Sequence, residues 1–149
     1  MKTFHLAVIA IITALAACEA PVPFKREYQP VQQQVSELCL ERNPKVIDAN
    51  FHNDLALALA EHDITPRQYQ GPTPDDCPLV LRYIAWYNLS FNSYNPSRFL
   101  GRFEVTVFEG SQQIGFMSYN ARNAGKDEAK FNRPHTTLAL MVQQLFPNT

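Results

Sequence analysis

The sequence predicts an α+β domain built as a two-layer sandwich, with a mostly antiparallel sheet of four to five strands and two helices on one face. Three observations support this fold class. Apolar residues follow strand and helix periods in the order β-α-β-β-β-β-α. Each expected helix carries one apolar stripe, which has to be buried against a sheet. The chain has 149 residues, enough for one ordinary domain, and 46% of them are hydrophobic, as in globular proteins.

The composition excludes several classes of protein. The charges are nearly balanced, with 13 Lys and Arg residues against 14 Asp and Glu residues. Disordered polyelectrolytes combine low hydrophobicity with high net charge, so this class is excluded. Nucleic-acid binding needs a basic excess, so we expect no nucleic-acid partner. Only five glycines are present, which argues against a glycine-rich phosphate loop.

Residues 1–17 are predicted to be a lipoprotein signal peptide. Lys2 precedes an apolar run, residues 6–17, that is too short to span a bilayer as a stable helix. The run ends in Leu15-Ala16-Ala17-Cys18, which matches the bacterial lipobox in full. In that motif the cysteine is acylated and becomes the first residue of the mature chain. We therefore expect a lipid anchor on Cys18; the alternative is a plain secretory signal with a chance cysteine.

The mature chain is expected to face the periplasm from the outer membrane. In enteric bacteria an aspartate after the acylated cysteine retains a lipoprotein in the inner membrane, so Glu19 favours the outer membrane. Residues 18–37 contain several prolines and glutamines and follow no sustained period, so they are predicted to be the acylated cysteine and a flexible tether. Fully extended, such a tether reaches on the order of 60 Å. Residues 38–149 then form a single domain.

The first half of this domain is predicted to hold two strands around a helix. Residues 35–41 alternate as a strand, and Asn43-Pro44 turns the chain. Asp48 or Asn50 can cap a helix that ends near His62. Its apolar residues fall on one face: Phe51, Leu55, Ala58 and Leu59. Residues 64–70 are predicted to be the second strand, followed by a loop over residues 71–76.

The second half is predicted to contain three strands and a helix. Residues 79–89 are apolar on both faces, which is typical of a central strand covered on both sides, although Arg82 interrupts one face. A polar turn over residues 92–97 leads to a strand over residues 99–109. Glu109-Gly110-Ser111 forms a hairpin loop before the last strand, residues 113–120, in which Ile114, Phe116 and Ser118 share one face. Thr136 or Thr137 caps the final helix, whose apolar residues are Leu138, Met141, Val142 and Leu145.

Cys39 and Cys77 are predicted to form a disulfide. They are the two cysteines that remain after Cys18, and an even number of cysteines in an oxidising periplasm is typical of a disulfide. The alternative is a redox or metal-binding pair, but neither a CxxC spacing nor a histidine cluster supports it. The bond would join the first expected strand to the third.

The sequence predicts no catalytic set, no metal site and no cofactor. His52 and His62 lie ten residues apart on the first helix, about 15 Å along its axis, so they cannot share a metal. A hydrolase that uses His135 with Thr136 or Thr137 remains an alternative. It lacks the GxSxG elbow that would expose such a nucleophile.

An aromatic cluster supplies the candidate binding residues: Tyr83, Trp86, Tyr87, Phe91 and Tyr94. Two interpretations are open. Tyr83 and Trp86 can fill the two faces of a central strand, or the cluster can form a binding surface, since such side chains are enriched at protein interfaces and stack on sugars. The candidate partner-binding residues are Trp86, Tyr87, Phe91 and Tyr94. Phe91 and Tyr94 are expected in the turn beyond the strand, which would expose them.

Several short motifs spread over residues 35–146 together resemble one family. Besides the lipobox they are Cys39-Leu40-Glu41-Arg42-Asn43-Pro44-Lys45-Val46-Ile47, Glu61-His62, Cys77, Leu81-Arg82-Tyr83 with Trp86, Gln113-Ile114-Gly115 and Ala129-Lys130. In these motifs the chain is similar to a family of short proteobacterial outer-membrane lipoproteins without an assigned activity. Members usually carry an acidic residue where this chain has Asn88. The resemblance implies paired cysteines and an outer-membrane address.

Taken together, these features predict a non-enzymatic binding or accessory protein. We expect it to be attached to the membrane by its N-terminal lipid and to bind an envelope protein or glycan. The alternative is an inhibitor or immunity-type lipoprotein that acts against a periplasmic toxin or lysozyme and shares the same architecture.

Overall fold

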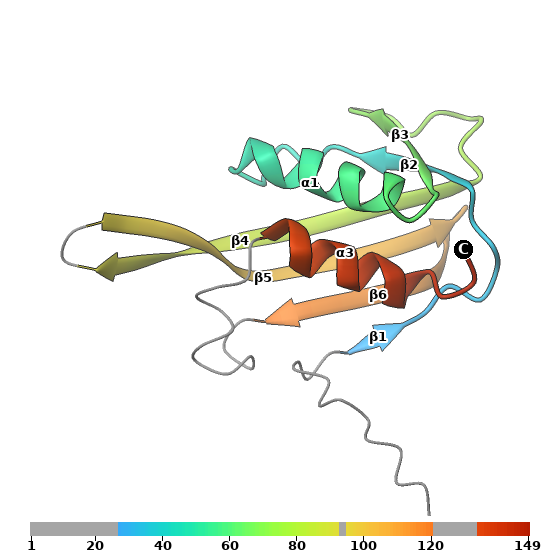
Figure 1. Ribbon diagram of the computed structural model, residues 1–149. Helices are drawn as coiled ribbons and strands as arrows, with labels where there is room; N and C mark the ends of the chain where they lie inside the picture. The colour runs from blue at the N-terminus through green and yellow to red at the C-terminus, as the bar shows by residue number, and fades with distance from the viewer. Residues whose placement is uncertain (1–26, 93–94, 121–133) are drawn as a thin grey trace, which may run out of the picture.

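The computed structural model describes residues 27–92, 95–120 and 134–149. The elements follow in the order β1 (Tyr28–Gln29), β2 (Glu37–Glu41), α1 (Ala49–Ala60), β3 (Thr65–Tyr69), β4 (Leu79–Asn92), β5 (Asn95–Glu109), β6 (Gln112–Asn120) and α3 (Pro134–Leu145). The strands form one sheet, and both helices lie side by side on the same face of it (Figure 1). The α+β fold class and the order of the helices and main strands are confirmed. The sheet has six strands rather than four to five, because β1 adds an edge.

The sheet is mixed, with the strand order β1-β6-β5-β4-β2-β3. β2 runs parallel to both β3 and β4, whereas β4, β5, β6 and β1 pair in antiparallel fashion. The parallel pairing of β2 with β3 follows from the connection between them, because a crossover through α1 returns the chain to the same end of the sheet. β2 therefore joins a parallel edge to an antiparallel body.

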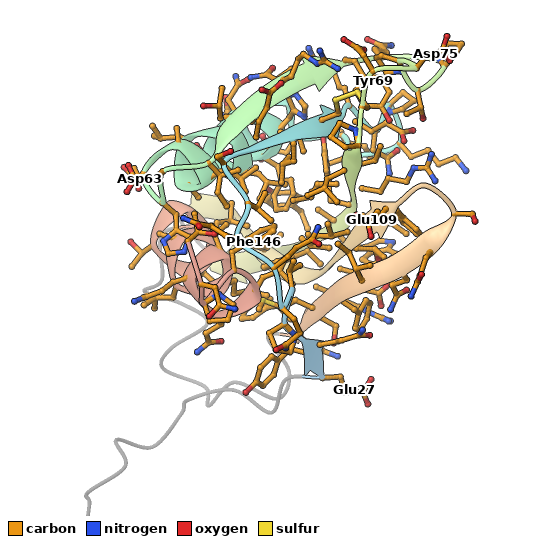
Figure 2. The ribbon with its side chains drawn as sticks, turned by 90° about the vertical axis from the view of Figure 1, so that its right-hand side faces the viewer. Glu27, Asp63, Tyr69, Asp75, Glu109 and Phe146 are labelled. Carbon is orange, nitrogen blue, oxygen red and sulfur yellow. A yellow bond between two sulfur atoms is a disulfide. The ribbon has the colours of Figure 1, made fainter. Side chains whose placement is uncertain are left out.

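The hydrophobic core lies between the helices and the sheet. Alternate residues of the strands point to the helices and are buried, as a pleated strand requires. Figure 2 shows the two layers end-on, with the helices on one side of the sheet. The largest fully buried side chains come from both layers: Leu38, Leu40, Phe51, Leu55, Leu59, Leu81, Phe103, Met117, Leu138, Leu145 and Phe146.

The opposite face of the sheet, here called the outer face, is not covered by either helix (Figure 1). Ile84 and Trp86 of β4 lie on this face and are 42% and 44% exposed. The expectation that β4 is covered on both sides is therefore wrong. Phe116 and Ser118 lie on this outer face, since the neighbouring Met117 and Tyr119 are buried, whereas Ile114 is partly buried and packs against the core.

The packed domain begins about ten residues earlier than the sequence predicted. Tyr28–Gln29 pairs with β6, and Val31 and Val35 are both buried in the core. The N–H of Val31 also donates to the carbonyl of Leu145 at 2.8 Å. The tether expected over residues 18–37 is thus wrong from Glu27 onwards, because two valines spaced among the glutamines supply apolar anchors.

Gly115 of β6 provides the space into which Val31 packs. A Cβ at this position would lie 2.5 Å from the Val31 Cγ2 and 3.3 Å from the Leu145 Cδ1. Val31 is fully buried and its β-branched side chain is stiff, so it cannot move aside easily. We expect Gly115→Ala to lower the free energy of unfolding by about 1–3 kcal/mol, a typical cost of overpacking. Urea denaturation measures this, with Ser111→Ala in the adjacent exposed turn as the control; equal midpoints for the two variants would contradict the prediction.

The ends of several elements differ from the expected ones. Asp48 caps α1 as predicted, and its carboxylate accepts from the N–H of Asn50. α3 starts at Pro134, so Thr136 and Thr137 lie inside its first turn and neither caps it. Proline favours the first helical position, where its missing N–H costs no hydrogen bond. Among the described residues, no helix is long and apolar enough to cross a membrane.

The β4–β5 hairpin is longer than predicted and projects beyond the helices (Figure 1). β4 continues to Asn92 and β5 begins at Asn95, which pair with each other. The polar turn expected over residues 92–97 is therefore wrong except at residues 93–94, which lie outside the described residues. Antiparallel pairing thus extends through the polar residues on both strands of the hairpin.

Candidate partner-binding site

The strongest candidate site is a cluster on the outer face, here called the outer-face patch. It consists of Arg82, Ile84 and Trp86 of β4 and Arg102, Glu104 and Phe108 of β5. The hairpin register places Ile84 opposite Glu104 and Trp86 opposite Arg102, so the two strands present these side chains on the same face. Large apolar side chains that stand exposed together among charged ones are typical of an interaction surface.

Two arginines lie against aromatic rings of the patch. The guanidinium of Arg102 lies 5.2 Å from the ring centroid of Trp86. The guanidinium of Arg82 lies 5.3 Å from the ring centroid of Phe108. Cation–π contacts of this kind contribute about 0.5–1 kcal/mol at exposed sites. They favour this arrangement of the rings and the arginines before any partner binds.

Each arginine is also paired with a carboxylate that is less exposed than itself. Arg82 donates to Glu41 at 2.6 Å, and their side chains are 51% and 30% exposed. Arg102 pairs with Glu104, and the arginine is again the more exposed partner. The hydrogen bond to Glu41 raises the pKa of Arg82 above its ordinary value. The patch therefore turns positive charge outward around an apolar centre.

A groove of about 490 Å³ runs beside the patch, between β4 and the turn that follows β2. Its lining includes Ile84 and Phe108 from the patch and Pro44 and Lys45 from the turn. The side-chain amide of Asn43 donates to the Tyr83 carbonyl at 2.8 Å and fixes this turn against β4. The groove is large enough to accept a protruding side chain of a partner.

The four candidate binding residues do not form one surface with each other. Trp86 lies in the outer-face patch, but Tyr87 lies on the inner face, where it is half-buried and hydrogen-bonded to Asp48. Burial raises the pKa of the Tyr87 phenol well above its usual value, and the nearby charge of Asp48 adds to this effect. Phe91 lies in β4 opposite Pro96 rather than in a turn, and Tyr94 lies outside the described residues.

The sequence reasoning missed Ile84, Arg82, Arg102 and Phe108 as parts of a site. A signal was present in β5, where Arg102, Glu104 and Thr106 alternate with the buried Phe103, Val105 and Val107. A strand with one polar face borders solvent on that side. The tight hairpin pairs this polar face with Ile84 and Trp86, which marks both residues as solvent-facing.

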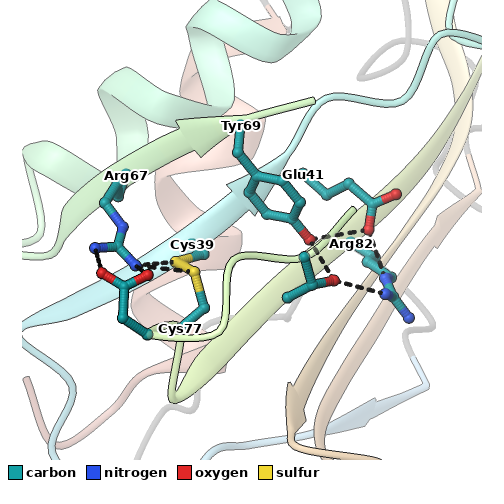
Figure 3. Close-up of a disulfide and its surroundings, with 8 residues drawn as sticks. Cys39, Glu41, Arg67, Tyr69, Cys77 and Arg82 are labelled. Carbon is teal, nitrogen blue, oxygen red and sulfur yellow. Dashed lines mark hydrogen bonds and ion pairs between the residues drawn. A yellow bond between two sulfur atoms is a disulfide. The ribbon is translucent and has the colours of Figure 1, made fainter. Parts of the chain in front are cut away.

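The predicted disulfide between Cys39 and Cys77 is confirmed. Cys39 lies in β2 and Cys77 just before β4, so the bond joins these two neighbouring strands (Figure 3). The guanidinium of Arg67 donates to Sγ of Cys77 at 3.0 Å and of Cys39 at 3.3 Å. The same group binds both carboxylate oxygens of Asp76, and this hydrogen bonding lowers the pKa of Asp76.

His52 is the one buried histidine among the described residues, and its hydrogen bonds connect α1 to the sheet. Its ring lies between the Tyr83 hydroxyl, 2.9 Å from Nδ1, and Oε1 of Gln68, 3.0 Å from Nε2. Since Oε1 can only accept, Nε2 donates to it and Nδ1 accepts from Tyr83. The neutral ring is fully hydrogen-bonded between α1 and the sheet.

The residues of the alternative hydrolase are only partly described. Thr137 is buried and Thr136 is exposed, so the two hydroxyls of the first turn of α3 point to different surroundings. Of His135 only the backbone is described. Within the described residues, no group of three His, Cys, Asp or Glu side chains could hold a metal ion. Cys18 lies outside the described part of the chain.

Searches against protein-family models, curated proteins and solved structures found no match to this chain.

Proposed function

We propose that this protein is a lipid-anchored envelope protein that acts by binding a partner protein through the outer-face patch. The single observation that carries this proposal is the exposure of Trp86 and Ile84 on a sheet face that no described element covers. Tryptophan and arginine are the residue types most often found at the energetic centre of protein interfaces. The lipobox supports an anchor at Cys18, and the residue pattern supports the outer membrane as its location.

The chemistry of the patch specifies the surface that it fits. An apolar projection of the partner would occupy the groove beside Ile84 and Phe108. Carboxylates around that projection would meet Arg82 and Arg102, which are the outward members of their ion pairs. Charge complementarity of this kind sets orientation and the rate of encounter more than it sets affinity.

The anchor limits where such a partner can be. Residues 19–26 separate the acylated cysteine from the first described residue, and these eight residues span at most about 30 Å. The domain would therefore stay close to the membrane surface. A partner would be an outer-membrane protein or a periplasmic protein that reaches the membrane.

Site-specific crosslinking tests the proposal directly. A photo-crosslinking amino acid at position 86 is expected to capture one dominant partner in cells. The same amino acid at position 57 serves as the matched control, because Leu57 is also about half exposed but lies on α1. With the purified partner, Trp86→Ala is expected to weaken binding at least about tenfold, as for a residue at an interface centre, whereas Leu57→Ala leaves it unchanged.

Two outcomes would overturn the patch as the binding site: equal crosslinking from positions 86 and 57, or unchanged affinity of the Trp86→Ala protein. A Cys18→Ser protein tests the anchor separately, because it is expected to incorporate no labelled fatty acid, whereas the parent chain is labelled. The identity of the captured protein distinguishes an accessory role from inhibition, because an envelope protein supports the former and a toxin or lysozyme the latter.

A further inference from the structure

A second pocket, of about 360 Å³, lies at the junction of β1 and β6, away from the outer-face patch on β4 and β5. It is lined by five glutamines and two aliphatic residues: Gln29, Val31, Gln32, Gln33, Gln112, Gln113 and Ile114. The glutamines come from two distant segments, one formed by β1 and the connector that follows it, the other by the start of β6. No ionisable side chain lines the pocket.

The side chains of this pocket are suited to an uncharged ligand rich in hydroxyl groups. A glutamine amide offers one accepting oxygen and two donating N–H groups, and a hydroxyl likewise both donates and accepts. Of the five amides, only that of Gln32 has a hydrogen bond within the described residues, to the Pro30 carbonyl at 3.2 Å. The other four can bind a ligand without breaking a bond to the described protein.

The backbone of the pocket is held firmly while its glutamine side chains stay exposed. Val31 is buried against Gly115, and its N–H donates to the Leu145 carbonyl. The side-chain amide of Asn148 donates to the backbone carbonyl of Gln32 at 2.8 Å. Figure 2 shows this connector as it runs from β1, near Glu27, past Phe146 toward β2. A fixed backbone lowers the entropic cost of binding.

We infer that this glutamine pocket binds an uncharged hexose or N-acetylhexosamine unit of an envelope glycan. The amides would hydrogen-bond the hydroxyls at the rim of the sugar ring, and Ile114 would contact the C–H groups of its face. Both the glycan strands of peptidoglycan and the core sugars of lipopolysaccharide can present such units. The pocket and the outer-face patch lie on different strands, so binding at one does not require the other, while the assignment to an envelope glycan rests on the proposed envelope location.

NMR titration of the isotope-labelled mature chain, residues 18–149 with the Cys18→Ser substitution and the disulfide oxidised, tests the inference. Two probes are used, an N-acetylglucosamine tetramer and a maltose-type tetramer, to separate the two sources. We expect the glutamine side-chain amide signals of the pocket to shift with one of them, with a dissociation constant on the order of 1 mM. An oligogalacturonate of equal length is expected to cause smaller shifts, because its carboxylates find no cation in the pocket.

Paired variants locate the binding. Gln33→Ala combined with Gln112→Ala is expected to weaken the sugar at least about fivefold, the loss of roughly 1 kcal/mol of hydrogen bonding. Gln70→Ala combined with Gln143→Ala is the matched control, since both glutamines are exposed and lie outside the pocket. Absence of shifts with both sugars, or equal weakening by the two variants, would overturn the inference. All substituted side chains are exposed, so loss of folding does not obscure the result.

Discussion

Replacing both cysteines, Cys39→Ser together with Cys77→Ser, is expected to lower the free energy of unfolding by about 3–4 kcal/mol. The bond closes a loop with a sequence separation of 38 residues, and the chain-entropy model gives this magnitude for such a loop. That is a large part of the 5–15 kcal/mol typical of a domain.

The position of the bond in the sheet explains why its loss matters. β2 pairs with β4 only at Cys39–Val80 and Leu40–Leu81, whereas β4 and β5 pair along nearly their whole length. The parallel edge of β2 and β3 is thus joined to the antiparallel body by a short ladder, by the disulfide and by α1. Without the disulfide, we expect the amides of β2 and β3 to lose more protection from hydrogen exchange than those of β5 and β6.

Chemical denaturation of the oxidised parent and the double variant measures the difference. Arg67→Gln is the matched control, because it removes the guanidinium from both sulfurs and from Asp76 but leaves the bond intact. Since the Arg67–Asp76 pair is solvent-exposed, this control is expected to shift the denaturation midpoint far less than the loss of the disulfide does. A loss below 1 kcal/mol in the double cysteine variant would contradict the role assigned to the disulfide.

Most elements of the fold could be predicted from periodicity, and the exceptions have physical causes. α1 is defined by its Asp48 cap and by an apolar stripe, and β4 by a run of branched and aromatic residues. β1 could not be predicted, since two residues carry no period and their pairing depends on β6, far away in the sequence. The burial of Val31 has the same cause: its partners Gly115 and Leu145 come next to it only in the tertiary fold.

The candidate site was predictable only in part. Aromatic residues in β4 indicated a surface, but the sequence of one strand does not show which of its faces a helix covers. The structure separates Trp86 from Tyr87 by placing both helices on the side of Tyr87. The contribution of β5 to the patch depends on the hairpin register, and the ion pair of Arg82 with Glu41 depends on the parallel pairing of β2 with β4. Both contacts join residues far apart in the sequence, so neither can be predicted from one segment alone.

The stability of the protein is expected to fall as the pH drops from about 7 to 5, and His52 is the expected cause. Burial lowers the pKa of His52 below its ordinary value of 6.5, and the charge of Arg42 acts in the same direction. The unfolded chain then binds this proton more readily than the folded chain. The contribution of neutral His52 to the free energy of unfolding is therefore fully present above about pH 6.5. It is lost as the pH falls from 6.5 through the lower pKa of the folded state.

The hydrogen bonds around the His52 ring also predict that protonation destabilises the folded state. A proton on Nδ1 of His52 would face the Tyr83 hydroxyl, which now donates to that nitrogen and also accepts, at 3.4 Å, from the N–H of Asn43. The hydroxyl would have to reverse its hydrogen bond in a buried site. Burial raises the pKa of Tyr83, so the phenol cannot respond by ionising near neutral pH.

Replacing His52 tests this account at two pH values. At pH 7.5, His52→Leu is expected to cost about 2–4 kcal/mol, because it leaves Tyr83 and Gln68 without their buried partner and alters the packing. Between pH 7 and 5 its stability is expected to change less than that of the parent, because the titrating group is gone. His62→Gln is the matched control, since His62 is half-buried, bonds to the Phe146 carbonyl and is expected to leave the pH dependence of His52 in place. If His52→Leu keeps the full pH dependence of the parent, another group causes it and the assignment to His52 is wrong.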